Sequence, residues 1–207
     1  MRERPILFSG AMVRAILDGR KTQTRRVCKA RGVDFIGSGG RSGADWNDPD
    51  CWGYEAGDGE WYVLSRSPSN GMRSIVCPYG QPGDRLWVRE TWNLIEAVFG
   101  GTTRPVYRAS PETYTQYPGI AWRPSIFMPR ALSRIQLDLL SVRVERVQDI
   151  DAIDAMHEGI TAPMLTDEYA TMREGFAQLW DTINAKRGYG WDVNPWVWAL
   201  TFKQVQP

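Results

Sequence analysis

Apolar residues alternate with other residues in several short stretches, and this alternation constrains the fold more than any other feature. Trp196, Trp198, Leu200 and Phe202 occupy every second position near residue 200. A period of two predicts a β-strand with one buried face. Further strands are predicted, on the same grounds or from a short apolar run, at residues 5–8, 86–92, 135–139 and 140–147.

Three predicted helices interrupt these strands. Ser9 can cap the first helix, which has an apolar face and ends at a glycine. The second covers residues 150–158, with Asp149 or Asp151 as its cap, and the third covers residues 166–187. Because the short strands are combined with peripheral helices and not with a regular βαβ repeat, we predict an α+β fold built on a small β-barrel. A length of 207 residues fits a single domain.

Charge is distributed unevenly along the chain, although the formal net charge is only +1. Residues 1–31 contain nine Lys or Arg against two acidic residues, and residues 104–146 contain seven Arg against three acidic residues. Residues 42–65 contain six acidic residues and no Lys or Arg, in a glycine-rich stretch that predicts a long loop. The two basic segments could converge on one anionic ligand, although single arginines are also typical of a solvated surface.

Cofactor and metal motifs are absent from the sequence. It contains no Walker A, dinucleotide-binding, HExxH or GxSxG pattern, and the glycine-rich residues 37–40 do not precede a helix-like segment. A zinc site is one use for the three cysteines and the single histidine, which are Cys28, Cys51, Cys77 and His157. Their irregular spacing favours ordinary reduced thiols. We therefore expect no metal and no cofactor.

The sequence also predicts a cytoplasmic protein. The odd number of cysteines, without a CxxC pair, gives no disulfide framework. The apolar run at residues 6–13 resembles a signal peptide only faintly, because it contains Ser9 and Gly10 and ends at Arg14. No run approaches the roughly 20 apolar residues that span a bilayer. We expect no membrane contact, and the oligomeric state stays open.

Three residues near predicted helix ends could carry chemistry without a catalytic histidine. Lys21 lies in a segment crowded with arginines, where neighbouring cations favour a neutral amine that can act as a base. Thr24 offers a hydroxyl, which becomes a nucleophile when a base takes its proton. Glu158 lies at a predicted helix C-terminus, where the macrodipole disfavours a negative charge, so it is a candidate general acid or base. Each residue taken alone is more typical of an ordinary surface or strand position.

One segment after the first predicted helix resembles a known family. Residues 19–26 read Gly-Arg-Lys-Thr-Gln-Thr-Arg-Arg and are similar to the GxKxxExR signature of the ASCH domain, a PUA-like β-barrel family related to RNA-binding modules. Thr24 replaces the glutamate, as in the small bacterial N(4)-acetylcytidine amidohydrolases of this family. Residues 83–88 resemble the family's strand entry, residues 155–160 the helix end that supplies a glutamate, and residues 196–203 the closing strand. The chain also resembles ASCH proteins encoded by bacteriophages and prophages.

This resemblance implies an amidohydrolase that removes an acyl group from a modified nucleobase or nucleoside. Lys21 would deprotonate Thr24, whose oxygen attacks the acyl carbon, and Glu158 would act as acid and base. Because positions 21 and 24 face opposite sides of a regular strand, Lys21 has to lie in the preceding turn or reach around with its long side chain. Substrate contacts are expected from Arg20, Arg26, Trp87, Arg89 and Glu90.

The resemblance covers only part of the chain. Residues at about 30–76 and 93–134 exceed what the compact hydrolases contain. We therefore expect one ASCH domain over residues 1–207, with a Gly/Asp-rich insertion in the first of these segments and a further elaboration in the second.

Two other functions stay open at this point. A PUA-like module would bind single-stranded RNA, or cleave it as a ribonuclease, by stacking bases on tryptophans and holding phosphates with arginines. The residues that fit this function are Trp87, Trp92, Trp122, Arg123, Arg130 and Arg134. An inactive barrel that serves as a protein-interaction or counter-defence factor predicts neither hydrolysis nor RNA binding.

Overall fold

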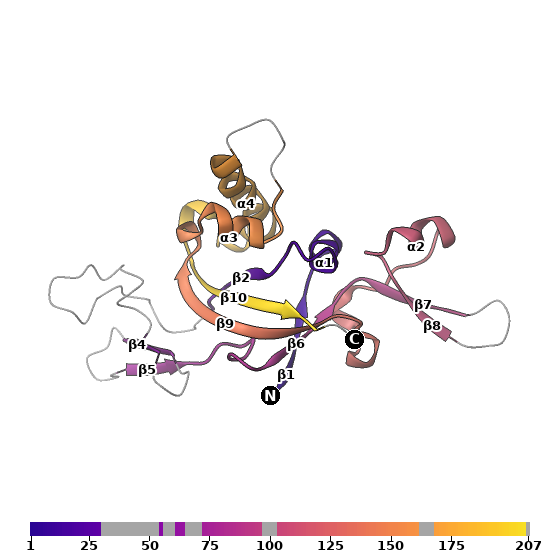
Figure 1. Cartoon of the computed structure of the whole chain (residues 1–207), viewed down its shortest axis with the longest axis horizontal. Helices are drawn as coiled ribbons and strands as arrows, with labels where there is room; N and C mark the ends of the chain where they lie inside the picture. The colour runs from indigo at the N-terminus through magenta and orange to yellow at the C-terminus, as the bar shows by residue number, and fades with distance from the viewer. Residues whose placement is uncertain (30–53, 56–60, 65–71, 97–102, 162–167, 206–207) are drawn as a thin grey trace.

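A five-stranded sheet forms the centre of the molecule (Figure 1). The computed structural model describes residues 1–29, 54–55, 61–64, 72–96, 103–161 and 168–205. The strands of the sheet follow the order β1-β6-β9-β10-β2, and only β1 and β6 pair in parallel. Their bounds are Glu3–Leu7 for β1, Gln23–Val27 for β2, Arg85–Arg89 for β6, Gln136–Arg146 for β9 and Trp196–Gln204 for β10.

Strand β9 takes the place of the two strands predicted at residues 135–139 and 140–147. Leu139 and Ser141 pair with consecutive residues of β10, so that Leu140 has no partner across the strand. Leu140 is 53 % exposed, and this extra residue inverts the apolar alternation as a β-bulge does. The prediction of two separate strands was therefore wrong, because the break in the pattern is a bulge within one strand.

Helices pack against the sheet in two places (Figure 1). Helix α1 (Gly10–Leu17) connects β1 to β2, and Ser9 caps it as predicted by accepting a hydrogen bond from the Met12 N–H at 3.4 Å. Helices α3 (Ala152–His157) and α4 (Glu168–Asn184) pack against each other. The 3-10 helices are η2 (Ser125–Phe127), η3 (Arg130–Leu132), η4 (Val147–Asp149), η5 (Ala185–Arg187) and η6 (Trp191–Val193).

Two buried clusters hold these helices in place. The larger one contains Val13 and Ile16 of α1 together with residues of β1, β6, β9 and β10. The smaller one contains Phe176 and Trp180 of α4 together with Val197 of β10. Because successive side chains of a strand face opposite sides, β10 contributes to both clusters and joins the two groups of helices.

The α+β class is confirmed, but the sheet is not closed into a barrel. Strands β1 and β2 are its edges, and no ladder pairs them within the described residues. Helix α1 leads from one edge to the other and buries Val13 and Ile16 in the core. Closure requires the edge strands to pair, but here a side-chain contact joins them, from Arg26 Nη2 of β2 to Leu7 O of β1 at 2.6 Å. A curved, open sheet therefore replaces the small barrel that the sequence predicted.

The two segments predicted as additions carry small sheets of their own. Strands β3 (Tyr54–Glu55), β4 (Trp61–Leu64) and β5 (Met72–Ile75) form one antiparallel sheet, and β7 (Trp92–Glu96) and β8 (Thr103–Tyr107) form another. Helix α2 (Pro111–Gln116) follows β8. The glycine-rich residues 37–40, Cys51 and most of the acidic stretch lie outside the described residues.

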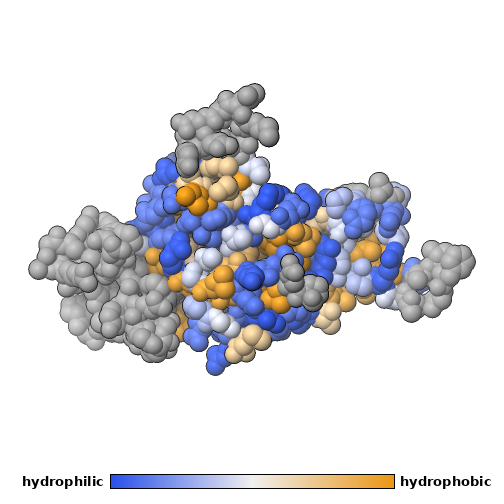
Figure 2. Space-filling model, in the orientation of Figure 1, coloured by the Kyte–Doolittle hydropathy of each residue, from blue (hydrophilic) through white to orange (hydrophobic). Residues whose placement is uncertain are grey.

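Hydrophobic residues form scattered patches among hydrophilic ones on the face shown in Figure 2. The longest helix, α4, has 17 residues and buries only a stripe that includes Phe176 and Trp180. Within the described ranges, no helix combines the length and the apolar character needed to cross a membrane.

Candidate active site

The segment between α1 and β2 brings Lys21 to the end of α3. Gly19 has a φ of 73°, and this left-handed conformation ends α1. The Lys21 N–H then donates to Ala15 O at 2.9 Å, and the Thr22 N–H donates to His157 O at 2.8 Å. Lys21 precedes β2, which is one of the two arrangements that allow a shared site with Thr24.

Lys21 and Glu158 form a buried ion pair. Lys21 Nζ donates to Glu158 Oε2 at 2.5 Å and to the Glu158 peptide oxygen at 2.8 Å. The two residues are only 2 % and 4 % exposed. Burial lowers the pKa of the Lys21 amine below its ordinary value of 10.5, and the negative charge of Glu158 opposes this shift only in part. The unprotonated amine is therefore more accessible here than in an ordinary lysine.

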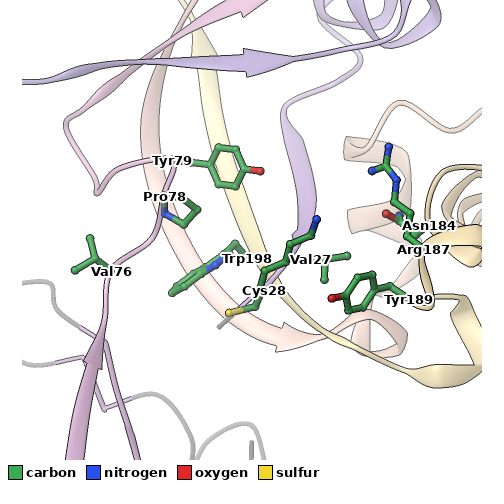
Figure 3. Close-up of a pocket in the computed structure, with 10 residues that line it drawn as sticks. Val27, Cys28, Val76, Pro78, Tyr79, Asn184, Arg187, Tyr189 and Trp198 are labelled. Carbon is green, nitrogen blue, oxygen red and sulfur yellow. The ribbon is translucent and has the colours of Figure 1, made fainter. Parts of the chain in front are cut away.

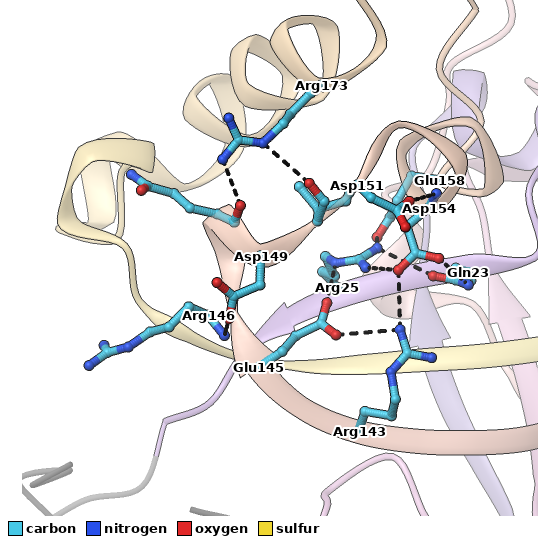
Figure 4. A network of polar contacts seen from close by, with 12 residues as sticks. Gln23, Arg25, Arg143, Glu145, Arg146, Asp149, Asp151, Asp154, Glu158 and Arg173 are labelled. Atoms are coloured by element: carbon cyan, nitrogen blue, oxygen red, sulfur yellow. Dashed lines mark hydrogen bonds and ion pairs between the residues drawn. The ribbon is translucent and has the colours of Figure 1, made fainter. Parts of the chain in front are cut away.

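Arg25 holds Glu158 from the other side (Figure 4). Its Nη1 lies 3.4 Å from Glu158 Oε1, while its Nε and Nη2 bind Glu145 at 2.7 Å and Asp154 at 2.5 Å. Asp154 also accepts a hydrogen bond from Gln23 at 2.8 Å. Because three carboxylates surround the fully buried guanidinium, Arg25 orients Glu158 without adding uncompensated charge to the site.

Arg25 and Asp154 are missing from the site residues that the sequence predicted. Asp154 precedes Glu158 by four residues on α3, a spacing that places both side chains on one face of a helix. Arg25 belongs to the same basic segment as Lys21. A pair of acidic residues at helical spacing, together with that basic segment, was the signal that could have revealed this network.

Thr24 lines a small cavity beside the ion pair. It pairs with Leu200 in the middle of β2 and is 2 % exposed. The cavity has a volume of about 60 Å³ and lies between α1, β2, the end of α3 and α4. Its polar lining residues are Thr24, Arg25, Arg26, Glu158, Asn184 and Arg187. In the part of the chain that the structure describes, no hydrogen bond joins Thr24 Oγ1 to Lys21 Nζ, because the amine donates to Glu158.

The two neighbouring arginines occupy different positions. Arg26 lines the cavity, donates from Nη2 to Leu7 O at 2.6 Å, and lies 5.0 Å from the centroid of the Phe8 ring. Arg20 has a 44 % exposed side chain and donates to Gly159 O at 3.4 Å. Arg26 therefore faces the cavity, whereas Arg20 lies on the surface nearby.

Trp87, Arg89 and Glu90 lie apart from this cavity. They belong to β6 or directly follow it, and β9 and β10 separate β6 from β2. Arg89 stacks 4.7 Å from the centroid of the Trp87 ring. Glu90 is 1 % exposed and accepts two hydrogen bonds from Arg134, at 2.8 and 3.0 Å. These three predicted substrate contacts thus lie on or next to a strand that does not pair with β2.

The cysteines are placed for packing. Cys28 and Cys77 are buried, and neither forms a disulfide within the described residues. Burial raises the pKa of Cys77 to about 11, so its thiol stays protonated at neutral pH. In the described ranges, no three His, Cys, Asp or Glu side chains are grouped so that they could hold a metal ion. Cys51, which the conceived zinc site also needs, lies outside those ranges.

No protein-family model, curated protein or solved structure matches this chain. The ASCH resemblance is thus carried by short motifs alone, at residues 19–26, 83–88, 155–160 and 196–203.

Gly159 allows α3 to approach Lys21 closely, and we expect its substitution to destabilise the protein. It has a φ of 91°, and an added Cβ would lie 3.0 Å from Ala15 Cβ and 3.3 Å from Lys21 Cβ. Gly19 is the matched control, because its φ is 73° but no atom lies within 4 Å of an added Cβ. Gly19→Ala should lower the free energy of unfolding by about 1–2 kcal/mol through backbone strain, and Gly159→Ala by about 1–3 kcal/mol more through overpacking. Urea denaturation measures both losses, and equal values would contradict the close approach.

The ion pairs of Asp154 predict a specific loss of stability in acid. Burial would raise the pKa of Asp154, but Arg25, Gln23 and Arg143 together hold it below the ordinary value of 3.8. The unfolded state therefore takes up this proton first, so the stabilisation is present above pH 3.8 and is lost as the pH falls below it.

Asp154→Asn should lower the free energy of unfolding by about 1.5–3 kcal/mol at pH 7, which is the usual contribution of hydrogen bonds to charged groups. The difference from the wild type should shrink at pH 3. Asp18→Asn is the control, because the Asp18 carboxylate that pairs with Arg20 is 55 % exposed and should contribute little. Thermal unfolding at both pH values provides the measurement, and a difference that does not depend on pH would exclude this explanation.

Proposed function

We propose that the chain is an amidohydrolase that removes an acyl group from a modified nucleobase of the N(4)-acetylcytidine kind. The observation that supports this proposal is the Thr24 hydroxyl, which lines the same small cavity as a glutamate held in a buried ion pair with a lysine. A nucleophile, a base and a proton donor are the three groups that acyl transfer needs. The fold would then be an opened form of the PUA-like barrel of ASCH domains.

The first step uses the unprotonated form of Lys21. The neutral amine has two N–H bonds and one lone pair, and both N–H groups donate to Glu158. The lone pair accepts the Thr24 proton after a side-chain rotation, and Thr24 Oγ1 then forms a bond to the acyl carbon. Arg26 stabilises the negative charge that develops on the acyl oxygen.

The second half of the reaction passes a proton along the ion pair. Lys21 transfers a proton to Glu158 Oε2 across the 2.5 Å hydrogen bond, and Glu158 protonates the nitrogen of the base as the bond between the acyl carbon and that nitrogen breaks. The carboxylate of Glu158 then takes a proton from water, whose oxygen attacks the acyl group. The bond between Thr24 Oγ1 and the acyl carbon then breaks, and Thr24 takes up the proton that Glu158 passes back through Lys21. The site is thereby restored, and a carboxylic acid is released.

RNA binding without hydrolysis is less well supported by the geometry. Trp87 and Trp92 are 7 % and 4 % exposed. Arg130 is paired with Glu3 at 2.8 Å, and Arg134 is paired with Glu90 at 2.8 Å. Tryptophans that are buried offer no face to a base, and arginines that are already neutralised contribute less to phosphate binding.

The decisive experiment incubates the protein with N(4)-acetylcytidine and follows the release of cytidine and acetate by chromatography. A parallel reaction contains a single-stranded RNA, in which cleavage and salt-dependent binding are measured. Turnover of the acetylated nucleoside supports the proposal. RNA binding or cleavage without any deacetylation would overturn it in favour of a PUA-like module. The absence of both deacetylation and RNA binding would overturn it in favour of a protein-interaction factor.

A further inference from the structure

A second, larger cavity, whose lining is shown in Figure 3, shares lining residues with the cavity of Thr24. Its volume is about 420 Å³, within the usual range for pockets that bind small molecules. Val27, Asn184 and Arg187 line both cavities, so the two are contiguous. A ligand in the larger cavity can therefore extend one substituent toward Thr24.

Aromatic rings form the walls of the larger cavity. Tyr79 and Tyr189 point into it from opposite sides, and Trp198 lies between them (Figure 3). Trp198 belongs to β10 and is 2 % exposed, so its ring is held in place by the core. The rings of Tyr79 and Tyr189, which are only half-buried, are suited to stacking on a nucleobase.

Asn184 lies at the junction of the two cavities. Its Nδ2 donates to Trp180 O at 3.2 Å, which fixes the amide group. Its side-chain oxygen can then accept a hydrogen bond from the N–H of an acylated amino group on the base. This contact would place the acyl carbon on the side of Thr24.

Arg26, Lys29 and Arg187 bring positive charge to these cavities. Lys21 and Arg25 are neutralised by carboxylates, but no carboxylate in the described part of the chain pairs with Arg26, Lys29 or Arg187. Burial lowers the pKa of the Arg26 guanidinium; Tyr79 and Glu158 oppose this shift, and the positive charge of Arg187 adds to it. Lys29 lies 5.9 Å from the centroid of the Tyr189 ring, at the aromatic wall. Cations gathered in this way favour an anionic ligand.

We infer that the substrate is a phosphorylated nucleotide, with its base between Tyr79 and Tyr189 and its phosphate on Lys29 and Arg187. This inference rests on the proposed function and adds the substrate class to it. Lysine and arginine are the usual phosphate ligands in proteins, and the exposed positions of Lys29 and Arg187 leave room for a phosphate at the mouth of the cavity.

Calorimetric binding to the Thr24→Val variant tests the inference, because this variant leaves the ligand uncleaved. The ligands are N(4)-acetylcytidine, its 5′-monophosphate, and a short single-stranded RNA that contains one N(4)-acetylcytidine. We expect the monophosphate to bind at least about tenfold more tightly than the nucleoside at low salt, as hydrogen bonds between charged groups allow.

Two sets of variants locate the phosphate and the base. Adding Lys29→Met and Arg187→Met to Thr24→Val should abolish the preference for the monophosphate, whereas Lys186→Met, an exposed cation on η5 that lines neither cavity, should keep it. Tyr79→Leu and Tyr189→Leu should each weaken both ligands by roughly tenfold, the usual effect of losing a stacked ring.

The outcomes separate this inference from the proposed function. Equal affinities for nucleoside and monophosphate overturn the inference, while hydrolysis of N(4)-acetylcytidine by the wild type would still support the amidohydrolase. A phosphate preference that persists without Lys29 and Arg187 also overturns it. If the RNA binds at least as tightly as the monophosphate, the phosphate recognised is a diester within a polymer, and if it does not bind, the substrate is the free nucleotide.

Discussion

Thr24→Val is expected to reduce kcat for deacylation by roughly a thousandfold or more, the scale at which loss of a nucleophile acts in hydrolases that form an acyl intermediate. Valine has the shape of threonine and the same preference for a strand, so β2 and its pairing with β10 should be preserved. The only group removed is the hydroxyl that lines the cavity. Steady-state kinetics on the acylated nucleoside measure the effect.

Two further variants make this result interpretable. Thr24→Ser keeps a hydroxyl and should retain part of the activity. Thr22→Val makes the same chemical change two residues earlier, at a position that lines neither cavity, and should leave kcat close to the wild-type value. If Thr24→Val retained full turnover, the water would have to attack the substrate directly, and Thr24 would not be the nucleophile.

Glu158→Gln is expected to lower the free energy of unfolding by about 3–5 kcal/mol, because it leaves the buried ammonium of Lys21 without its nearest counter-charge. The cost of an unpaired ammonium cannot exceed the free energy of deprotonating Lys21, because the amine can release its proton and become neutral. Each pH unit between 7 and the ordinary lysine pKa of 10.5 corresponds to about 1.36 kcal/mol, which limits the cost at pH 7 to about 5 kcal/mol. Urea denaturation monitored by tryptophan fluorescence provides the value.

The pH dependence of this variant has a definite sign. Its Lys21 has a pKa well below that of the unfolded chain, so the unfolded state binds more protons between pH 7 and 10. The stability of Glu158→Gln should therefore rise with pH relative to the wild type. A constant difference between pH 7 and 9 would mean that the loss of stability has another origin.

Lys21→Met should destabilise the protein less than Glu158→Gln. In that variant Glu158 still has the Arg25 guanidinium at 3.4 Å, whereas Lys21 has no second carboxylate in the described network. The double variant Lys21→Met/Glu158→Leu removes both charges and should recover part of the loss. A double variant that is less stable than either single one would contradict the view that the cost arises from an unpaired buried charge.

Local features of the fold could be predicted from the sequence because neighbouring residues determine them. The Ser9 cap and the turn at Gly19 bound α1 as predicted, and the alternation at residues 196–202 lies within β10. Asp151, one of the two proposed caps of α3, accepts a hydrogen bond from the Asp154 N–H at 2.7 Å. These signals extend over one turn of helix or a few strand residues.

The features that the sequence did not reveal depend on pairing between distant segments. Whether the sheet closes is decided by the partners of β1 and β2, and no local pattern encodes them. The bulge at Leu140 is visible only once β9 pairs with β10. For the same reason, the sequence did not reveal that Glu90 pairs with Arg134, 44 residues further on.

The order of strands in the sheet also governs when the site can form. Strand β2 carries Thr24, Arg25 and Arg26, and among the described strands it pairs only with β10, through pairs such as Thr24 with Leu200. Nearly the whole chain must therefore be synthesised before β2 can dock, and contacts of such long sequence separation form slowly. A nascent chain would expose the basic β2 segment until β10 leaves the ribosome, and a protease that cuts between the two strands before docking would leave the proposed catalytic residues on unfolded chain.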